Sequence, residues 1–122
     1  MFVIDVMSRV PVYEQIINQV EEQILTGLLN SGDKMPSVRS LSVSLSINPN
    51  TIQKAYTGLD RKKLIVTVPG KGSFISQEAL DILGASSREK MPEFKQAVRE
   101  LALAGITKDE LIQAVNNVFK EM

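Results

Sequence analysis

The sequence predicts a mainly α-helical protein with one small β-hairpin, on three observations. Apolar residues recur at spacings of three and four along most of the 122 residues, which places them on one face of each helix. β-Branched residues cluster in residues 64–75, around a Pro-Gly-Lys-Gly sequence that is typical of a turn. A helix-start signal follows the end of a short predicted helix by only two residues. That spacing requires a tight turn between two helices.

Two helices are predicted in the first 45 residues. The first spans residues 11–29, with Pro11 in its first turn. The second is short and begins after Ser37, a favourable N-cap residue. The residues expected on their inward faces are Ile17, Val20, Ile24, Leu28, Val38, Leu41 and Leu45.

The third helix begins directly after residues 46–47. Asn48 can cap it, Pro49 presets the backbone of its first position, and the apolar pattern continues to about residue 63. Two helices joined by so short a turn cross steeply, which is the layout of a helix-turn-helix. Ile52, Ala55, Tyr56 and Leu59 are expected to face inward, and Asn50, Gln53, Lys54 and Thr57 outward.

A β-hairpin is predicted directly after the helix-turn-helix. Residues 64–68 and 73–75 are its strands, and Pro69-Gly70-Lys71-Gly72 is its tip. The glycines allow the backbone to approach a surface closely, so Lys71 can reach a phosphate or the minor groove. By itself, a Gly-Lys-Gly sequence is more typical of an ordinary tight turn. In this order, however, the elements form a winged helix-turn-helix domain, which we expect to span residues 8–77.

Residues 78–122 are expected to form a helical tail. One short helical turn is predicted near residue 80, followed by a linker at residues 84–87. Two longer helices follow, one ending at Gly105 and one starting at a capping box on Thr107. Their apolar faces predict a dimer interface formed by Phe94, Val98, Leu101, Leu111, Val115, Val118 and Phe119. The sequence leaves open which of these residues instead complete the core of one subunit.

The net charge is zero, but the basic residues are concentrated in the middle of the chain. Residues 32–74 contain seven basic and two acidic residues, a net charge of +5, whereas acidic residues outnumber basic ones on either side. This segment contains both the helix-turn-helix and the hairpin, which favours nucleic acid as a partner. Asn and Gln side chains can pair with the adenine edge in the major groove, and Lys and Thr with guanine or phosphate. Ser37 and Arg39 would lie near the DNA backbone, although a surface salt bridge is the simpler interpretation of Arg39 alone.

Composition excludes several other classes of function. The chain has no His and no Cys, which removes the usual ligands of structural zinc, the Cys and Ser-His nucleophile systems and disulfides. The acidic pairs Glu21-Glu22 and Asp109-Glu110 are typical of helix surfaces, so no enzymatic activity, metal or cofactor is expected. No uncharged apolar stretch approaches the roughly 20 residues of a membrane span, and no signal peptide is evident. We therefore expect a cytoplasmic protein without a membrane partner.

Three sequence motifs resemble the GntR family of bacterial transcription regulators. They are MPSVRSL at residues 35–41, INPNTIQKAY at residues 47–56 and GKGSFI at residues 70–75, and residues 13–16 also fit. The Asn-Pro-Asn-Thr sequence and the short tail are most similar to the YtrA-type subgroup. This resemblance implies a homodimeric repressor that binds a palindromic double-stranded DNA operator.

The resemblance also implies DNA contacts by individual residues, namely Arg39, Asn48, Asn50, Thr51, Gln53, Lys54, Gly70, Lys71 and Gly72. Ser37 and Thr57 are further predicted DNA-binding residues, from their places at the start of the second helix and on the outward face of the third. Pro49 and Gln53 stand where many family members carry arginine, so we expect an adenine preference through Asn50 or Gln53 in place of the arginine-to-guanine contact.

Other functions remain open from the residues alone. A winged helix that assembles with another protein without binding DNA is the alternative function, and it predicts an apolar exposed face on the third helix. RNA binding is a further possibility, although the chain has few aromatic residues for base stacking. A small-molecule effector could bind between the winged domain and the tail.

Overall fold

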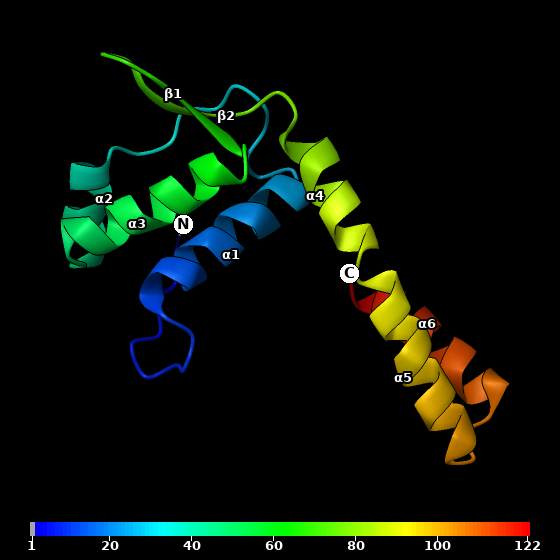
Figure 1. Ribbon diagram of the computed structural model, residues 1–122. Helices are drawn as coiled ribbons and strands as arrows, with labels where there is room; N and C mark the ends of the chain where they lie inside the picture. Colours follow the sequence, from blue (N-terminus) through cyan, green and yellow to red (C-terminus); the bar gives the residue numbers. More distant parts are fainter. Residues whose placement is uncertain (1) are drawn as a thin grey trace. The chain divides into compact units, whose positions relative to one another are not determined.

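The structure is a computed structural model that describes residues 2–122 (Figure 1). Its elements, in chain order, are α1 (Val12–Leu25), α2 (Val38–Leu45), α3 (Pro49–Arg61), β1 (Ile65–Val68), β2 (Gly72–Ile75), α4 (Ala79–Arg88), α5 (Met91–Leu103) and α6 (Lys108–Glu121). This mainly helical architecture with one antiparallel hairpin confirms the predicted fold class. Among the described residues, no helix is both long and apolar enough to cross a membrane.

Side-chain caps start three of the helices where the sequence predicts them. The hydroxyl of Ser37 accepts a hydrogen bond from the Ser40 amide at 3.0 Å. The Asn48 side chain accepts one from the Asn50 amide at 2.8 Å, and Pro49 follows as the first residue of α3. Thr107 caps α6 in the same way. Each cap satisfies a backbone amide that has no partner within its own helix, so these starts depend on local sequence.

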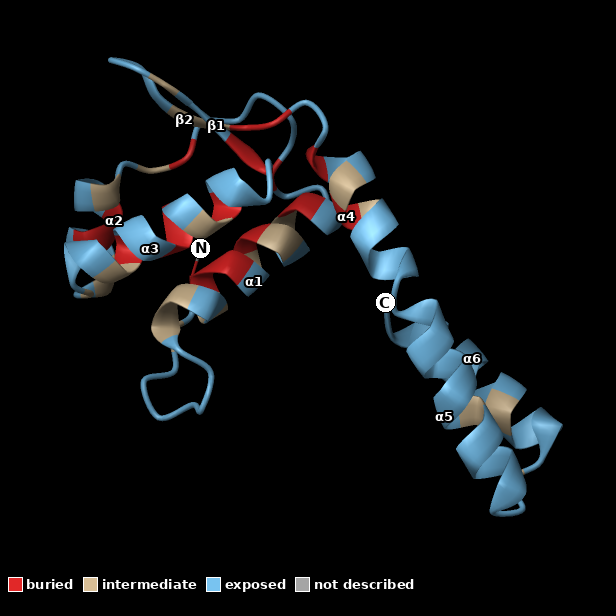
Figure 2. Cartoon of the chain, viewed as in Figure 1, coloured by how far each residue is buried: buried red, intermediate tan, exposed pale blue. Residues whose placement is uncertain are grey.

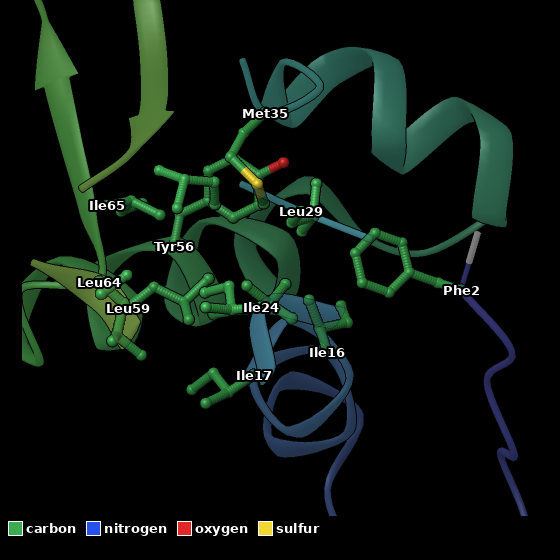
Figure 3. Packing of buried hydrophobic residues seen from close by; sticks show 14 of the residues in the cluster. Phe2, Ile16, Ile17, Ile24, Leu29, Met35, Tyr56, Leu59, Leu64 and Ile65 are labelled. Carbon is green, nitrogen blue, oxygen red and sulfur yellow. The ribbon is translucent and has the colours of Figure 1, made fainter. Parts of the chain in front are cut away.

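The core of the winged domain lies where α1 packs against α3 (Figure 3). Ile16 and Val20 of α1 and Ile52 and Leu59 of α3 are fully buried. Gly58 allows the two helices to approach closely, because a Cβ at this position would lie 2.7 Å from the Cδ1 atom of Ile17. The core also includes Phe2, Leu29, Met35, Leu41, Leu64, Ile65 and Ile75.

The hairpin attaches to the domain through both strands, because β1 packs against α3 and β2 pairs with the chain before α2. β1 and β2 pair antiparallel, with Val68 opposite Gly72. Pro69 and Gly70 occupy the centre of the turn, Gly70 has a φ of 77°, and the Lys71 amide donates to the Val68 carbonyl at 2.9 Å. This is the arrangement of a type II turn, which needs a positive φ at its second central residue. The chain before α2 runs along β2, where the Met35 amide donates to the Ser73 carbonyl at 2.8 Å.

The chain divides into two compact units, Met1–Gly84 and Ala85–Met122. The division falls within α4, whereas the sequence predicts a domain boundary between residues 77 and 78. In the second unit, α6 runs back along α5 (Figure 1). Every residue of α5 and α6 is described, and none of them is buried (Figure 2). The second unit therefore has no core of its own in a single chain.

The secondary structure differs from the prediction at two places. Residues 84–87 are helical, because α4 continues through Gly84 to Arg88, although the division between the two compact units does fall within them. Leu28 does not extend the apolar face of α1, because that helix ends at Leu25 and Gly27 adopts a φ of 82°. The turn leaves Leu28 74% exposed and buries Leu29 instead.

Helices α2 and α3 both end on a residue in the left-handed conformation that is not glycine. Lys63 follows α3 with a φ of 62°, and Ser46 follows α2 with a φ of 55°. After α3, the amides of Lys63 and Leu64 donate to the carbonyls of Asp60 and Leu59. This is the hydrogen-bond pattern of a Schellman motif, which is usually built on glycine because a Cβ is strained there.

Replacing Lys63 with Gly is expected to stabilise the fold. The substitution removes the left-handed strain, partly offset by the greater freedom of glycine in the unfolded chain, for a net gain of ~0.5–1 kcal/mol. Urea unfolding followed by circular dichroism measures the change. Lys63→Ala is the matched control because it removes the charge and keeps the strain. Equal stability of the Gly and Ala variants would contradict the strain argument.

Candidate nucleic-acid interface

Helix α3 presents an exposed polar face opposite its buried one. Ile52, Ala55, Tyr56 and Leu59 are buried, as the sequence predicts. The predicted outward residues Asn50, Gln53, Lys54 and Thr57 are all exposed. The Gln53 side-chain amide donates to the Thr57 hydroxyl at 3.3 Å, which orients two of these side chains together. The face therefore offers amide, hydroxyl and ammonium groups and no apolar surface, contrary to what the protein-assembly alternative predicts.

The remaining predicted residues of the helix-turn-helix differ in the exposure of their side chains and in whether these already have a partner in the protein. Asn48 is exposed, but its side-chain oxygen is occupied by the cap of α3. Thr51 is only half exposed. Arg39 is exposed in the first turn of α2, where the described residues give it no ion-pair partner. The described residues therefore do not form the surface salt bridge that is the simpler interpretation of Arg39.

The start of α2 and the tip of the hairpin line one open groove of about 400 Å³. It brings together four predicted residues, Ser37, Gly70, Lys71 and Gly72. Residues 32–35 fix this arrangement because they pair with β2, and Tyr56 supports it from α3. The Tyr56 hydroxyl donates to the Pro36 carbonyl at 2.6 Å, and burial raises the pKa of Tyr56 to about 12. The buried face of α3 is thereby joined to the segment that positions Ser37.

Three residues of the interface escape the sequence prediction. Lys34 forms an isolated antiparallel β-bridge with Phe74 through its backbone, and it lines the groove beside Gly72. Tyr13 and Arg61 line a second shallow groove with Asn50, Gln53, Lys54 and Thr57. The basic charge of the middle segment includes Lys34 and Arg61, but no spacing rule places them at these grooves. Tyr13 lies far from α3 in the sequence, so only the packing of α1 reveals its position.

The second unit contains an apolar hollow of about 450 Å³ between α5 and α6. Five of the seven predicted interface residues line it, namely Phe94, Val98, Leu101, Leu111 and Val115. The other two, Val118 and Phe119, do not line it but are 56% and 69% exposed. Ile112, Ala97 and Ala114 complete the apolar lining, and Lys108 lies at its edge.

Comparison with known proteins identifies this arrangement. The family model "Bacterial regulatory proteins, gntR family" matches residues 12–75, which contain the helix-turn-helix and the hairpin. The chain belongs to the GntR family. It is therefore a GntR-family DNA-binding transcription regulator with a winged helix fold.

Relatives across the whole chain support this assignment. The HTH-type transcriptional repressor YtrA of Bacillus subtilis (strain 168) is 38% identical over 97% of this chain and 92% of that protein. A crystal structure of a transcriptional regulator from Oenococcus oeni has a TM-score of 0.76 and 29% identity, covering 98% of this chain and 99% of the other. A structure of AraR(DBD) in complex with operator ORX1 has a TM-score of 0.54 and 25% identity, and covers 62% of this chain and 93% of that one.

These matches confirm the sequence-based resemblance to the GntR family and its YtrA-type members. They describe transcription regulators and not enzymes. The assignment of individual side chains to DNA or to a subunit interface remains a prediction.

Tyr56→Phe is expected to destabilise this GntR-family domain at neutral pH and to reverse the difference at high pH. Removing the hydrogen bond to Pro36 costs ~1 kcal/mol. In wild type the unfolded phenol ionises near pH 10.0 and the folded one near 12, so ionisation does not affect stability below pH 10 and favours the unfolded chain as the pH rises from 10 to 12. Two pKa units correspond to about 2.7 kcal/mol, which exceeds the value of the hydrogen bond, so the stability gap between the two proteins should narrow above pH 10 and change sign before pH 12.

Urea unfolding of both proteins at several pH values between 7 and 12 tests this. The two proteins differ only at residue 56, so the pH effects of all other groups cancel in the difference. Tyr13→Phe serves as the control for removing an exposed hydroxyl. A gap that stays constant up to pH 12 would contradict the role given to burial of Tyr56.

Proposed function

We propose that this regulator is a homodimeric repressor that occupies a palindromic operator and hinders RNA polymerase. The observation that carries the proposal is the exposed polar face of α3, which lies in the same unit as a cationic hairpin tip. A related domain has been solved in complex with operator DNA, and a relative over nearly the full chain is named a repressor. Both support operator binding as the function of this face.

In this proposal, α3 enters the major groove and reads bases with its amides. Asn50 and Gln53 are the side chains suited to the N6 and N7 edge of adenine. The hydrogen bond between Gln53 and Thr57 supports this role because it limits the rotamers of Gln53 before DNA is bound. Lys54 and Thr57 would contact phosphate or guanine.

The start of α2 and the hairpin tip would contact the DNA backbone. The N-terminus of α2 carries a partial positive charge, and Arg39 adds a full one in its first turn. Lys71 is exposed at the hairpin tip, and Lys34 lines the same groove. Phosphate contacts of this kind are independent of base sequence and make binding sensitive to salt.

The second copy would bind through the hollow between α5 and α6. A helical pair that buries none of its residues is not expected to be stable by itself. Burying the same apolar surface on two subunits forms a twofold interface. Two half-sites about 34 Å apart, or a multiple of that distance, can then be read together, and the second contact becomes intramolecular.

In vitro selection of duplex DNA by wild type and by Gln53→Ala tests operator binding. Wild type should enrich a palindrome, and Gln53→Ala should relax the preference at one base pair of each half-site by ~1–3 kcal/mol. Lys71→Ala is the matched control, since it should weaken binding to all sequences and reduce the salt slope by about 1 per subunit. Enrichment of no site, or an unchanged base profile in Gln53→Ala, would contradict the proposed readout.

Leu101→Asp is expected to convert the dimer to monomer, because it places a charge in the apolar hollow. Analytical ultracentrifugation across a range of protein concentrations measures the change. Leu103→Asp is the matched control: the residue lies on the same helix, is 88% exposed and does not line the hollow. Dimers of equal stability in both variants would place the interface elsewhere.

A further inference from the structure

An aromatic ring from α1 lies against a cation on the exposed face of α3. The ammonium nitrogen of Lys54 is 4.0 Å from the centroid of the Tyr13 ring. The two residues are brought together by the packing of α1 on α3 and lie on the groove that also contains Gln53 and Arg61. The contact therefore lies within the surface proposed to enter DNA.

The Tyr13 ring is the more fixed partner of this pair. Tyr13 is half buried and packs against the hydrophobic core from the first turn of α1. Its hydroxyl donates to a Glu14 carboxylate oxygen at 3.1 Å, and that hydrogen bond and negative charge raise the pKa of Tyr13. The packing against the core holds the ring with its face toward Lys54.

Lys54, by contrast, has a long side chain that would otherwise sample many rotamers. Among residues 2–122 it forms no ion pair, whereas Lys62 at the end of the same helix is held by Glu21 at 2.7 Å. An ammonium over an aromatic face is attracted by the ring quadrupole and keeps its outer side available to a further anion. Fixing a cation before binding lowers the entropy lost when it meets a phosphate.

We propose that Tyr13 is a positioning residue for DNA recognition: its ring face holds the Lys54 ammonium at the groove shared with Arg61, where the cation meets a backbone phosphate of the operator. The inference rests on the proposed entry of α3 into the major groove. It assigns the function to the ring and not to the hydroxyl. Tyr13 thereby links the first helix of the domain to phosphate binding by the third.

A double-mutant cycle on the selected operator duplex tests this inference. Wild type, Tyr13→Leu, Lys54→Gln and the double variant are titrated by fluorescence anisotropy at several salt concentrations. Tyr13→Leu should weaken binding about two- to fivefold per subunit, the range of an exposed cation–π contact. In the Lys54→Gln background the same change should have no further effect. Lys54→Gln should also make the slope of log affinity against log salt shallower by about 1 per subunit.

Two further variants separate the ring from other roles of Tyr13. Tyr13→Phe keeps the ring and should bind within about twofold of wild type. Lys62→Gln removes a cation from the end of the same helix, and its effect should add to that of Tyr13→Leu without coupling. Thermal unfolding confirms that each variant folds, and Tyr13→Met replaces Tyr13→Leu in the cycle if the leucine variant does not.

Defined outcomes overturn the inference. Each of three results would exclude positioning by the ring. Tyr13→Leu could lower DNA affinity equally in wild type and in Lys54→Gln, or Lys54→Gln could leave the salt slope unchanged. The third is a loss of affinity in Tyr13→Phe as large as that in Tyr13→Leu. If wild type binds the operator and Gln53→Ala changes its base preference, such a result removes this inference alone. If wild type prefers no duplex, the proposed function fails and the inference with it.

Discussion

The packing of α1 against α3 is the contact on which the other features of the winged domain depend. Fully buried side chains from both helices meet there, and the absence of a Cβ at Gly58 leaves room for the Ile17 side chain. Because this contact fixes which side of α3 is buried, it also fixes which side is exposed. The polar face of α3 is thus a consequence of core packing, and the same contact sets Tyr13 beside Lys54 and Glu21 beside Lys62.

A second set of contacts links the hairpin to the helix-turn-helix. The chain before α2 pairs with β2, and the Tyr56 hydroxyl holds the Pro36 carbonyl from the buried side of α3. One tyrosine therefore contributes to the core with its ring and to the placement of Ser37 with its hydroxyl. The hairpin tip and the start of α2 lie on one groove because both are attached to this short segment.

The two units differ in how much of their apolar surface a single chain buries. The first unit buries a continuous core, whereas α5 and α6 bury no residue and flank an apolar hollow. Apolar surface of this extent on small helices is typical of an interaction site. In the proposed dimer, pairing of two copies through this hollow would bury the apolar residues of the tail.

The sequence by itself determined the features that depend on neighbouring residues. Ser37, Asn48 and Thr107 cap helices as expected, the Pro-Gly turn closes the hairpin, and the helical spacing identifies both faces of α3. At residues 84–87 the low helix propensity of one glycine and two serines predicts a break in the helix, but α4 continues to Arg88. Intrinsic propensity is a weak prior that structural context can override.

Tertiary structure alone decided the contacts between distant segments. Lys34 reaches the hairpin tip because its segment pairs with β2, and Tyr13 reaches Lys54 because α1 packs on α3. No periodicity in the sequence encodes either pairing, since both depend on how whole elements dock. The faces of each helix follow from a repeat of three and four residues, but the neighbour that each face meets is set by close packing of the complete core.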